Sequence, residues 1–319
     1  MTEKEKPNTE KKDNNLPAKY VPPADDYKYP LLEDLAGTPE FKETLENICT
    51  NITNSEVFRM MASEPEKSYI FVGEPGTGKT FALKAIRNTI MGQNPNTGFM
   101  PYDIGKYGTA YINVGAVNLQ KFFDLGRKNA NDGFNVIYWF DEIDALMSKR
   151  MSSNSHKEDD KVLECLMKNL QNINSYGVSE YFFGATNFPD ALDKAAIRSG
   201  RIDRIITFPK PDEYGIKKAY GLKINSANTS FNKDYGAELN LFNDINIDKI
   251  VTASEGFNYA DIEDVVKRSL RNNALKVVKS PDLLANIPQI TEKQVLYEID
   301  RLRKEKYETT RRPIGYKLK

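Results

Sequence analysis

The stretch GEPGTGKT, from Gly73 to Thr80, constrains the fold of this chain more than any other. It follows the apolar run YIFV (69–72) and precedes FALKAIRNTI (81–90), where apolar residues recur at helical spacing. A continuous apolar run is typical of a strand covered on both faces. Glycines let the backbone turn sharply between two elements. The sequence therefore predicts a strand, a tight glycine-rich loop and a helix in immediate succession.

Further apolar runs alternate with helical patterns as far as Pro211. They are AYINV (110–114), VIYWF (136–140), YFFGA (181–185) and RIITF (204–208). Strands that alternate with helices predict an α/β domain built on a parallel sheet, here with five strands. The domain boundaries that we predict are a flexible polar tail at 1–30, an α/β domain at 31–211, a helical domain at 212–310 and a basic tail at 311–319.

The region after FPKPD (208–212) has helical patterns only. Ile262, Val265, Val266 and Leu270 share one face of a predicted helix. Asn258, with Asp261 three residues later, resembles a capping arrangement at its start. TEKQVLYEIDRLRK (291–304) is predicted to form a further amphipathic helix.

The glycine-rich loop has the chemistry of a phosphate-binding site. Its pattern, Gly73-x-x-x-x-Gly78-Lys79-Thr80, matches the phosphate loop in full. Glycines let backbone N–H groups turn inward around an anion, and the following helix points its positive end there. Lys79 can reach the β- and γ-phosphates of a nucleotide, and the hydroxyl of Thr80 can ligate Mg²⁺.

A pair of carboxylates follows the predicted strand VIYWF. Asp141 at the strand end can hold Mg²⁺, directly or through water. Glu142, the next residue, points elsewhere and can polarise a water for attack on the γ-phosphate. The alternative is a solvated acidic turn, which a full phosphate loop in the same chain makes the weaker interpretation.

Composition excludes several other functions. The formal net charge is zero, which disfavours nucleic acid and membrane surfaces as partners. The single histidine, His156, excludes an HExxH zinc site and Ser-His or Cys-His hydrolases. Cys49 and Cys165 lie in helical apolar patterns and are expected to be buried reduced thiols, as in a cytoplasmic protein. We also expect no membrane span and no signal peptide, because no apolar run is long enough.

Four motifs together resemble one family. GEPGTGKT, WFDEIDAL, GATNFPDALDKAAIRSGRIDRIITFPKPD and EGFNYADIEDVVKRSL occur in the order and spacing of AAA ATPases. The similarity is to the narrow AAA clade, which includes proteasomal ATPases, membrane AAA proteases and the katanin/spastin group. It covers about residues 31–305, and implies a P-loop NTPase sheet with a C-terminal α-helical lid.

The resemblance implies a role for individual residues. Ala36 and Gly37 match the segment that packs on adenine, and Asn187 matches the polar sensor that orients the attacking water with Glu142. The implied cofactors are ATP and Mg²⁺. The implied nucleotide contacts are Ala36, Gly37, Glu74, Pro75, Gly76, Thr77, Gly78, Lys79, Thr80, Phe81 and Ala260; the implied metal ligands are Thr80 and Asp141; and the implied catalytic residues are Glu142, Asn187, Arg201 and Arg204.

Arg201 and Arg204 match the arginine fingers of the family, which reach the nucleotide of a neighbouring subunit. A ring, expected to be a hexamer, is therefore implied. The implied function is a Mg²⁺-dependent ATPase that remodels or disassembles a protein or protein complex, whose identity the sequence does not name. One alternative is an ATP-dependent assembly switch that threads no substrate. Another is a nucleic-acid motor, disfavoured by the zero net charge and supported only by the basic C-terminus.

The chain also departs from the family pattern. Tyr259 replaces a glycine in the lid motif, Asn225 replaces a histidine and Ser199 replaces a proline. If the second strand is at 110–114, the following segment, 115–135, is too short for the aromatic pore loop of the family. This short segment supports the alternative of an assembly switch that threads no substrate. Its Phe122 and Phe123 are expected to be buried. The preceding segment, 92–108, is expected to be a loop that exposes Phe99, Tyr102 and Tyr107.

Overall fold

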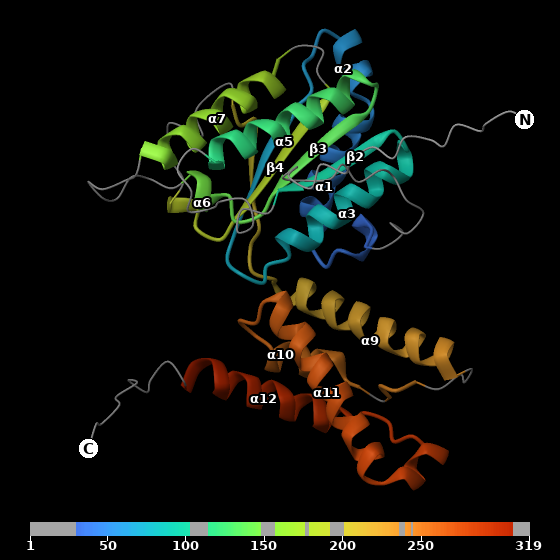
Figure 1. The fold of residues 1–319 in the computed structure, drawn as a ribbon. Helices are drawn as coiled ribbons and strands as arrows, with labels where there is room; N and C mark the ends of the chain where they lie inside the picture. The colour runs from blue at the N-terminus through green and yellow to red at the C-terminus, as the bar shows by residue number, and fades with distance from the viewer. Residues whose placement is uncertain are drawn as a thin grey trace, which may run out of the picture. The chain divides into compact units, whose positions relative to one another are not determined.

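The computed structural model describes residues 30–102, 114–147, 157–175, 179–191, 201–235, 240–243 and 245–308 (Figure 1). These residues fall into two compact units. Unit 1 comprises 55–70 and 93–205, and unit 2 comprises 30–54, 71–92 and 206–308. The predicted domain boundaries at 31, 211 and 310 stay predictions.

A five-stranded sheet is the framework of the fold, with the strand order β2-β3-β4-β1-β5. Strands β2, β3 and β4 pair in parallel, with Thr97 opposite Asn135 and Val136 opposite Glu180. The strands are β1 (Ser68–Val72), β2 (Thr97–Tyr102), β3 (Asn135–Phe140), β4 (Glu180–Thr186) and β5 (Arg204–Thr207). The predicted α/β fold with a five-stranded sheet is confirmed.

The second strand lies earlier in the chain than the sequence predicted. It is β2 at Thr97–Tyr102, whereas Val114, the last residue of the predicted strand 110–114, begins helix α5 (Val114–Asn131). Residues 110–113 lie outside the described part of the chain. The Gly, Pro and Asn residues of 92–108 made this stretch resemble a loop. Pro101 is nevertheless compatible with β2, because an edge strand tolerates a missing N–H. Pro101 is also its one exposed residue.

This correction changes the exposure of the aromatic residues. Phe99 and Tyr102 were expected on an exposed loop, but they are buried in β2, with 4% and 5% of their surface exposed. Tyr107 lies outside the described residues. Phe122 and Phe123 are fully buried, as predicted. The Phe122 ring meets Tyr102 edge-on, with centroids 5.0 Å apart, so β2 and α5 share one aromatic core.

Two long helices cover β3 and β4 in unit 1. Helices α5 and α7 (Lys157–Ile173) lie side by side against this part of the sheet (Figure 1). Unit 1 also contains α2 (Ser55–Met60), the short α6 (Asp144–Met147) and the 3₁₀ turn η2 (Pro189–Ala191).

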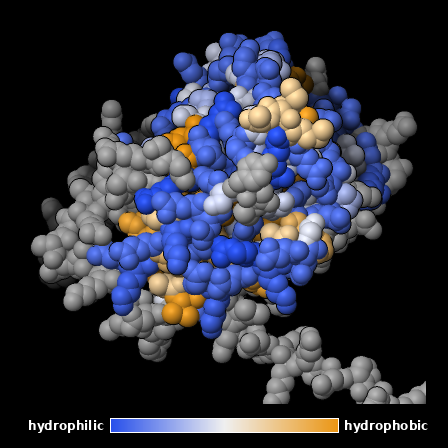
Figure 2. All heavy atoms as spheres, turned by 90° about the horizontal axis from the view of Figure 1, so that it is seen from above, coloured by the Kyte–Doolittle hydropathy of each residue, from blue (hydrophilic) through white to orange (hydrophobic). Residues whose placement is uncertain are grey.

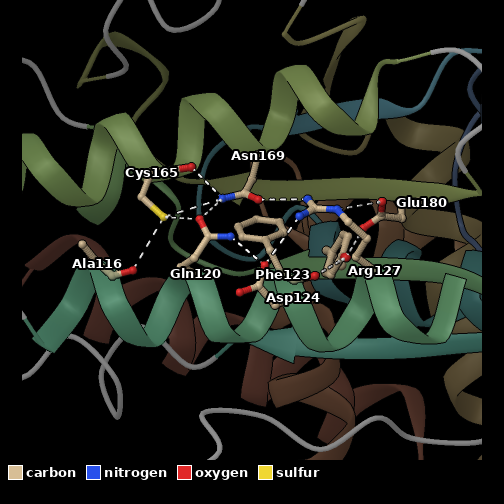
Figure 3. A network of polar contacts seen from close by, with 9 residues as sticks. Ala116, Gln120, Phe123, Asp124, Arg127, Cys165, Asn169 and Glu180 are labelled. Carbon is tan, nitrogen blue, oxygen red and sulfur yellow. Dashed lines mark hydrogen bonds and ion pairs between the residues drawn. The ribbon is translucent and has the colours of Figure 1, made fainter. Parts of the chain in front are cut away.

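A buried polar network joins these helices to the sheet (Figure 3). The hydroxyl of Tyr138 in β3 donates a hydrogen bond to Glu180, the first residue of β4. Arg127 of α5 lies 3.8 Å from the same carboxylate and donates to Asn169 of α7 at 3.1 Å. Burial raises the pKa of Glu180 above the ordinary carboxyl range. The network therefore fixes both helices on β3 and β4.

The two cysteines are free thiols, Cys49 buried and Cys165 partly buried. Burial raises the pKa of Cys49 to about 12, and it also raises the pKa of Cys165. Both thiols are therefore protonated at neutral pH. Cys49 is buried as predicted, whereas Cys165 is only partly buried.

Unit 2 contains the phosphate-loop segment and the helical region. Tyr220, Phe257 and Ile262 form part of the core of the helical region. An isolated parallel bridge, Phe242 to Ile290, interrupts a region that was predicted to be all helical. The helices of unit 2 are η1 (Leu32–Asp34), α1 (Pro39–Thr53), α3 (Lys79–Gln93), α9 (Glu213–Tyr235), α10 (Ile247–Ala253), α11 (Tyr259–Lys279), η3 (Pro281–Ala285) and α12 (Glu292–Glu308).

Polar residues dominate the face of the molecule in Figure 2, where hydrophobic residues form small separate patches. The most exposed large apolar side chains include Met60 and Met61, at the end of α2. No helix in the described ranges is long and apolar enough to cross a membrane.

Removal of the Phe122 ring should leave a cavity between β2 and α5. We expect Phe122→Ala to lower the free energy of unfolding by about 3–5 kcal/mol, measured by urea denaturation. Val117 lies on the same helix but is 51% exposed, so Val117→Ala should change stability by less than about 0.5 kcal/mol. Equal stability of the two variants would contradict the buried position of Phe122.

Glu180 should make stability depend on pH. Because its pKa is raised in the folded state, its contribution is fully present below the ordinary carboxyl pKa of about 4.3 and is lost as pH rises through the folded pKa. We expect the unfolding free energy of the wild type, relative to Glu180→Gln, to fall as pH rises from about 4. Denaturation of both proteins across this range measures it; a constant or rising difference would oppose the assignment.

Candidate nucleotide site

The phosphate loop connects β1, which ends at Val72, to α3, which begins at Lys79. Gly76 and Gly78 adopt left-handed backbone conformations, with φ of +79° and +94°. Residues with a Cβ rarely adopt these values, so the turn depends on glycine at both positions. The sequence prediction of a strand, a tight loop and a helix is confirmed.

Lys79 lies at the centre of this loop and is only 6% exposed. Its ammonium donates to the carbonyl oxygens of Gly73 at 2.7 Å and Glu74 at 2.8 Å. The Thr77 hydroxyl also donates to the Glu74 carbonyl at 2.8 Å. The two bonds from Lys79 hold its ammonium group at the beginning of α3, where it places a buried positive charge. Such a charge attracts a polyphosphate.

The first residues of α11 contact the phosphate loop. Asn258 donates from Nδ2 to the Pro75 carbonyl at 3.1 Å, and the N–H of Ala260 donates to the Gly76 carbonyl at 3.4 Å. A Cβ at Gly76 would lie 2.7 Å from the Asn258 side chain, so glycine also provides the space for this contact. Ala260 was among the predicted nucleotide contacts, and the structure places it beside the loop.

Ala36 and Gly37, the predicted adenine contacts, precede α1. Thr38 caps that helix by accepting a hydrogen bond from the N–H of Phe41 at 3.3 Å. Ala36 packs against the core of the helical region, and its carbonyl accepts a hydrogen bond from the Tyr259 hydroxyl. Thr80 and Phe81 lie in the first turn of α3. All the predicted nucleotide contacts therefore belong to unit 2.

Asp141 and Glu142 follow β3 in unit 1 and are both exposed. Glu142 has a left-handed φ of +52°, which is uncommon for a residue with a side chain. Its N–H is bonded to the Asp141 carboxylate at 3.1 Å. Strained backbone of this kind costs roughly 1–3 kcal/mol and is frequent at functional sites. Ala62 also has a positive φ, so strain alone does not identify a site.

Asn187 directly follows β4, and Asp144 fixes the chain beside it. The hydroxyl of Thr186 donates to the Asp144 carboxylate at 2.5 Å and accepts from the N–H of Phe188 at 2.9 Å. The N–H of Ile143 donates to the Ala185 carbonyl at 2.9 Å. The structure thus brings the segments that carry Glu142 and Asn187 together within unit 1.

The segment that carries the two arginines is held at its backbone. The Asp203 carboxylate accepts hydrogen bonds from the N–H groups of Lys67 at 2.7 Å and Ser68 at 2.9 Å. Asn174 donates to the Arg201 carbonyl at 3.0 Å. The Arg204 side chain forms an exposed ion pair with Glu66 at 3.5 Å. The main chain is therefore anchored more firmly than the Arg204 guanidinium.

Several residues in these contacts were not predicted from the sequence. Asp144, Asn174 and Asp203 position the backbone beside the predicted catalytic residues. Asn258 was predicted only as a helix cap, and its contact with Pro75 joins parts of the chain that are 183 residues apart. Asp144, Asp203 and Asn258 lie within the quoted motifs, where a short polar residue could have been noticed, whereas Asn174 lies in none of them.

The predicted metal ligands are the hydroxyl of Thr80 and the carboxylate of Asp141. Both provide hard oxygen donors, which suit Mg²⁺. Within the described ranges, no group of three or more His, Cys, Asp and Glu residues could hold a metal ion.

Comparison with known proteins identifies the family that this chain resembles. Residues 69–210 match the family described as the ATPase family associated with various cellular activities (AAA). The chain is 30% identical over 241 residues to the ATP-dependent zinc metalloprotease FTSH 7, chloroplastic, of Arabidopsis thaliana. It is also 30% identical over 239 residues to the ATP-dependent zinc metalloprotease FtsH of Pelodictyon phaeoclathratiforme, and 29% identical over 281 residues to the proteasome-activating nucleotidase of Saccharolobus islandicus.

These similarities cover different shares of the relatives. The matches to the metalloproteases span 74% of this chain but only 27% and 33% of those proteins. The match to the nucleotidase spans 86% of this chain and 66% of that protein. The shared region contains the phosphate loop, the carboxylates after β3 and the arginine segment. On the matched motifs and the fold together, this chain belongs to the AAA family of ATPases.

Proposed function

We propose that the chain binds ATP with Mg²⁺ at the phosphate loop, hydrolyses it, and uses the energy to remodel or disassemble a protein or protein complex in the cytoplasm. The observation that carries the proposal is the loop itself, with Gly76 and Gly78 left-handed and Lys79 buried at the beginning of α3. Backbone N–H groups, a helix N-terminus and a lysine together favour a polyphosphate.

The residues of unit 2 bind the nucleotide in this proposal. Lys79 leaves the carbonyls of Gly73 and Glu74 to contact the β- and γ-phosphates. Thr80 and Asp141 would hold the metal ion. A bound Mg²⁺ would neutralise charge on the phosphate oxygens.

The residues of unit 1 carry out hydrolysis. Glu142 accepts a proton from the attacking water, and Asn187 orients that water. The strained backbone of Glu142 supports a functional role, because the surrounding contacts hold an uncommon conformation there. The hydrogen bond between Asp144 and Thr186 holds the segments that carry Glu142 and Asn187 next to each other.

Arg201 and Arg204 act on the nucleotide of a neighbouring subunit, so that the active site is completed in a ring, which we propose to be a hexamer. Phosphoryl transfer develops negative charge that a guanidinium stabilises. The exposed ion pair of Arg204 with Glu66 can exchange for a nucleotide at little cost, since exposed pairs contribute roughly 0–1 kcal/mol.

A protein is the substrate class that we propose. The relatives are named as ATP-dependent proteases and as a proteasome-activating nucleotidase, which links ATP to protein substrates in those proteins. The alternative, an assembly switch without threading, had its main support in a short segment after a strand at 110–114. Because β2 ends at Tyr102 and α5 begins at Val114, that support is lost.

Glu142→Gln should bind ATP normally but hydrolyse it about 10²–10⁴ times more slowly, because an amide cannot accept the proton from water. Lys79→Ala should instead lose ATP binding. Phosphate release and binding of a fluorescent ATP analogue measure the two effects. Glu164→Gln, an exposed change on α7, is the matched control and should behave as wild type. Near-normal turnover by Glu142→Gln would contradict the assignment of Glu142 as the general base.

Assembly is tested by mixing inactive variants. Arg201→Ala should lose about 10³–10⁵ in turnover, and Lys79→Ala should lose nucleotide binding. An Arg201→Ala subunit keeps an intact phosphate loop, and a Lys79→Ala neighbour still supplies the arginine. ATPase activity should therefore return in the mixture. If the two variants co-assemble, as judged by size-exclusion chromatography, and activity stays absent, the arginine does not act between subunits.

A further inference from the structure

Tyr259 extends from the helical region to both ends of the proposed nucleotide site. It is the first residue of α11, and its hydroxyl donates a hydrogen bond to the Ala36 carbonyl. Its ring lies over the phosphate loop, since a Cβ at Gly78 would be 3.5 Å from the ring. The side chain thus spans the distance from the loop to the segment predicted to contact the base.

The neighbours of Tyr259 fix its backbone against the loop. Asn258 bonds to Pro75, and Ala260 bonds to Gly76. Asn258 and Asp261 also form a capping box, in which the N–H of each donates to the side chain of the other at 2.9 Å. Because residues on both sides are anchored, the ring can leave its position by side-chain rotation while the helix stays in place.

The Tyr259 hydroxyl and the Ala36 carbonyl lie beside Gly215, whose missing side chain leaves room for their hydrogen bond. A Cβ at Gly215 would lie 2.9 Å from the Tyr259 oxygen and 3.1 Å from the Ala36 oxygen. Burial, and then the nearby Asp212 carboxylate, raise the pKa of Tyr259 to about 12. The hydroxyl therefore keeps its proton at neutral pH and remains a donor to the Ala36 carbonyl.

Adenine carries an exocyclic amino group, which needs an acceptor when it is buried. If the phosphates bind to the loop, as the proposed function requires, and the base lies near Ala36, as the family resemblance implies, its amino group meets a carbonyl that already accepts from Tyr259. We propose that Tyr259 competes with the nucleoside base for the Ala36 carbonyl and thereby lowers the affinity of the site for nucleotide. The competition acts on the base and leaves the phosphate contacts unchanged.

The affinity effect follows from the hydrogen bond that nucleotide must displace. A net intramolecular hydrogen bond corresponds to roughly threefold to tenfold in an equilibrium constant. Tyr259→Phe keeps the ring over Gly78 and removes only the donor. It should therefore bind ATP about threefold to tenfold more tightly than the wild type, because no hydroxyl has to leave Ala36.

The test is calorimetric titration of the full chain with ATP and with inorganic tripolyphosphate, at one fixed Mg²⁺ concentration. Tripolyphosphate has no base, so Tyr259→Phe and wild type should bind it equally. Tyr220→Phe is the matched control, since its hydroxyl bonds to Ser254 at 2.8 Å within the core of the helical region. It should leave both affinities unchanged. Thermal unfolding verifies that each variant is folded.

Equal ATP affinities of wild type and Tyr259→Phe, or weaker binding by the variant, would overturn the competition. Equal tightening for ATP and tripolyphosphate would also overturn it, because the tyrosine would then act on the loop. The proposed function fails separately: the wild type would bind no ATP, or Lys79→Ala would bind as well as the wild type. The first of these results would also overturn the competition, which depends on a bound base.

Discussion

The contact between the phosphate loop and the start of α11 is the interaction on which the proposed nucleotide site depends. Gly76 has no side chain and a left-handed φ, so Asn258 can approach the loop and donate to the Pro75 carbonyl. The same asparagine caps α11 by accepting from the N–H of Asp261. One side chain therefore satisfies a helix end and a loop carbonyl at once. The amide nitrogen of Asn258 contacts the loop and its amide oxygen caps α11, so the loop and the start of the helix share one side chain.

Rigidity in unit 1 comes from polar contacts at both ends of β3 and β4. At the amino end of β4, Glu180 lies beside Arg127 (Figure 3) and accepts a buried hydrogen bond from Tyr138 of β3. At the carboxyl ends, Asp144 accepts from Thr186. A buried polar group without a partner is costly, so each set specifies one arrangement of the strands. The residues that follow these strands, including Glu142, the proposed general base, are therefore held in a fixed position.

Local sequence patterns predicted most of the fold but few of the contacts between residues that are far apart in the sequence. Continuous apolar runs identified four strands, and helical spacing with a capping pattern identified α11. Strand β2 was missed because the Gly, Pro and Asn residues of 92–108 are loop signals, and the edge position of β2 explains why Pro101 is tolerated in it. The bond between Tyr259 and Ala36 joins residues 223 positions apart. No local pattern encodes such a contact, since it depends on packing of the whole unit.

In the proposed function, the arginine segment is positioned by its own chain and acts on another subunit. Asp203 binds the N–H groups at the start of β1, and Asn174 binds the Arg201 carbonyl, so the main chain is fixed to the sheet. The Arg204 side chain has an exposed ion pair with Glu66, in which water and salt screen the attraction. A fixed backbone limits where the guanidinium can reach, and a weak pair lets it change partners. Both properties favour an arginine that acts across a subunit interface over one held within its own chain.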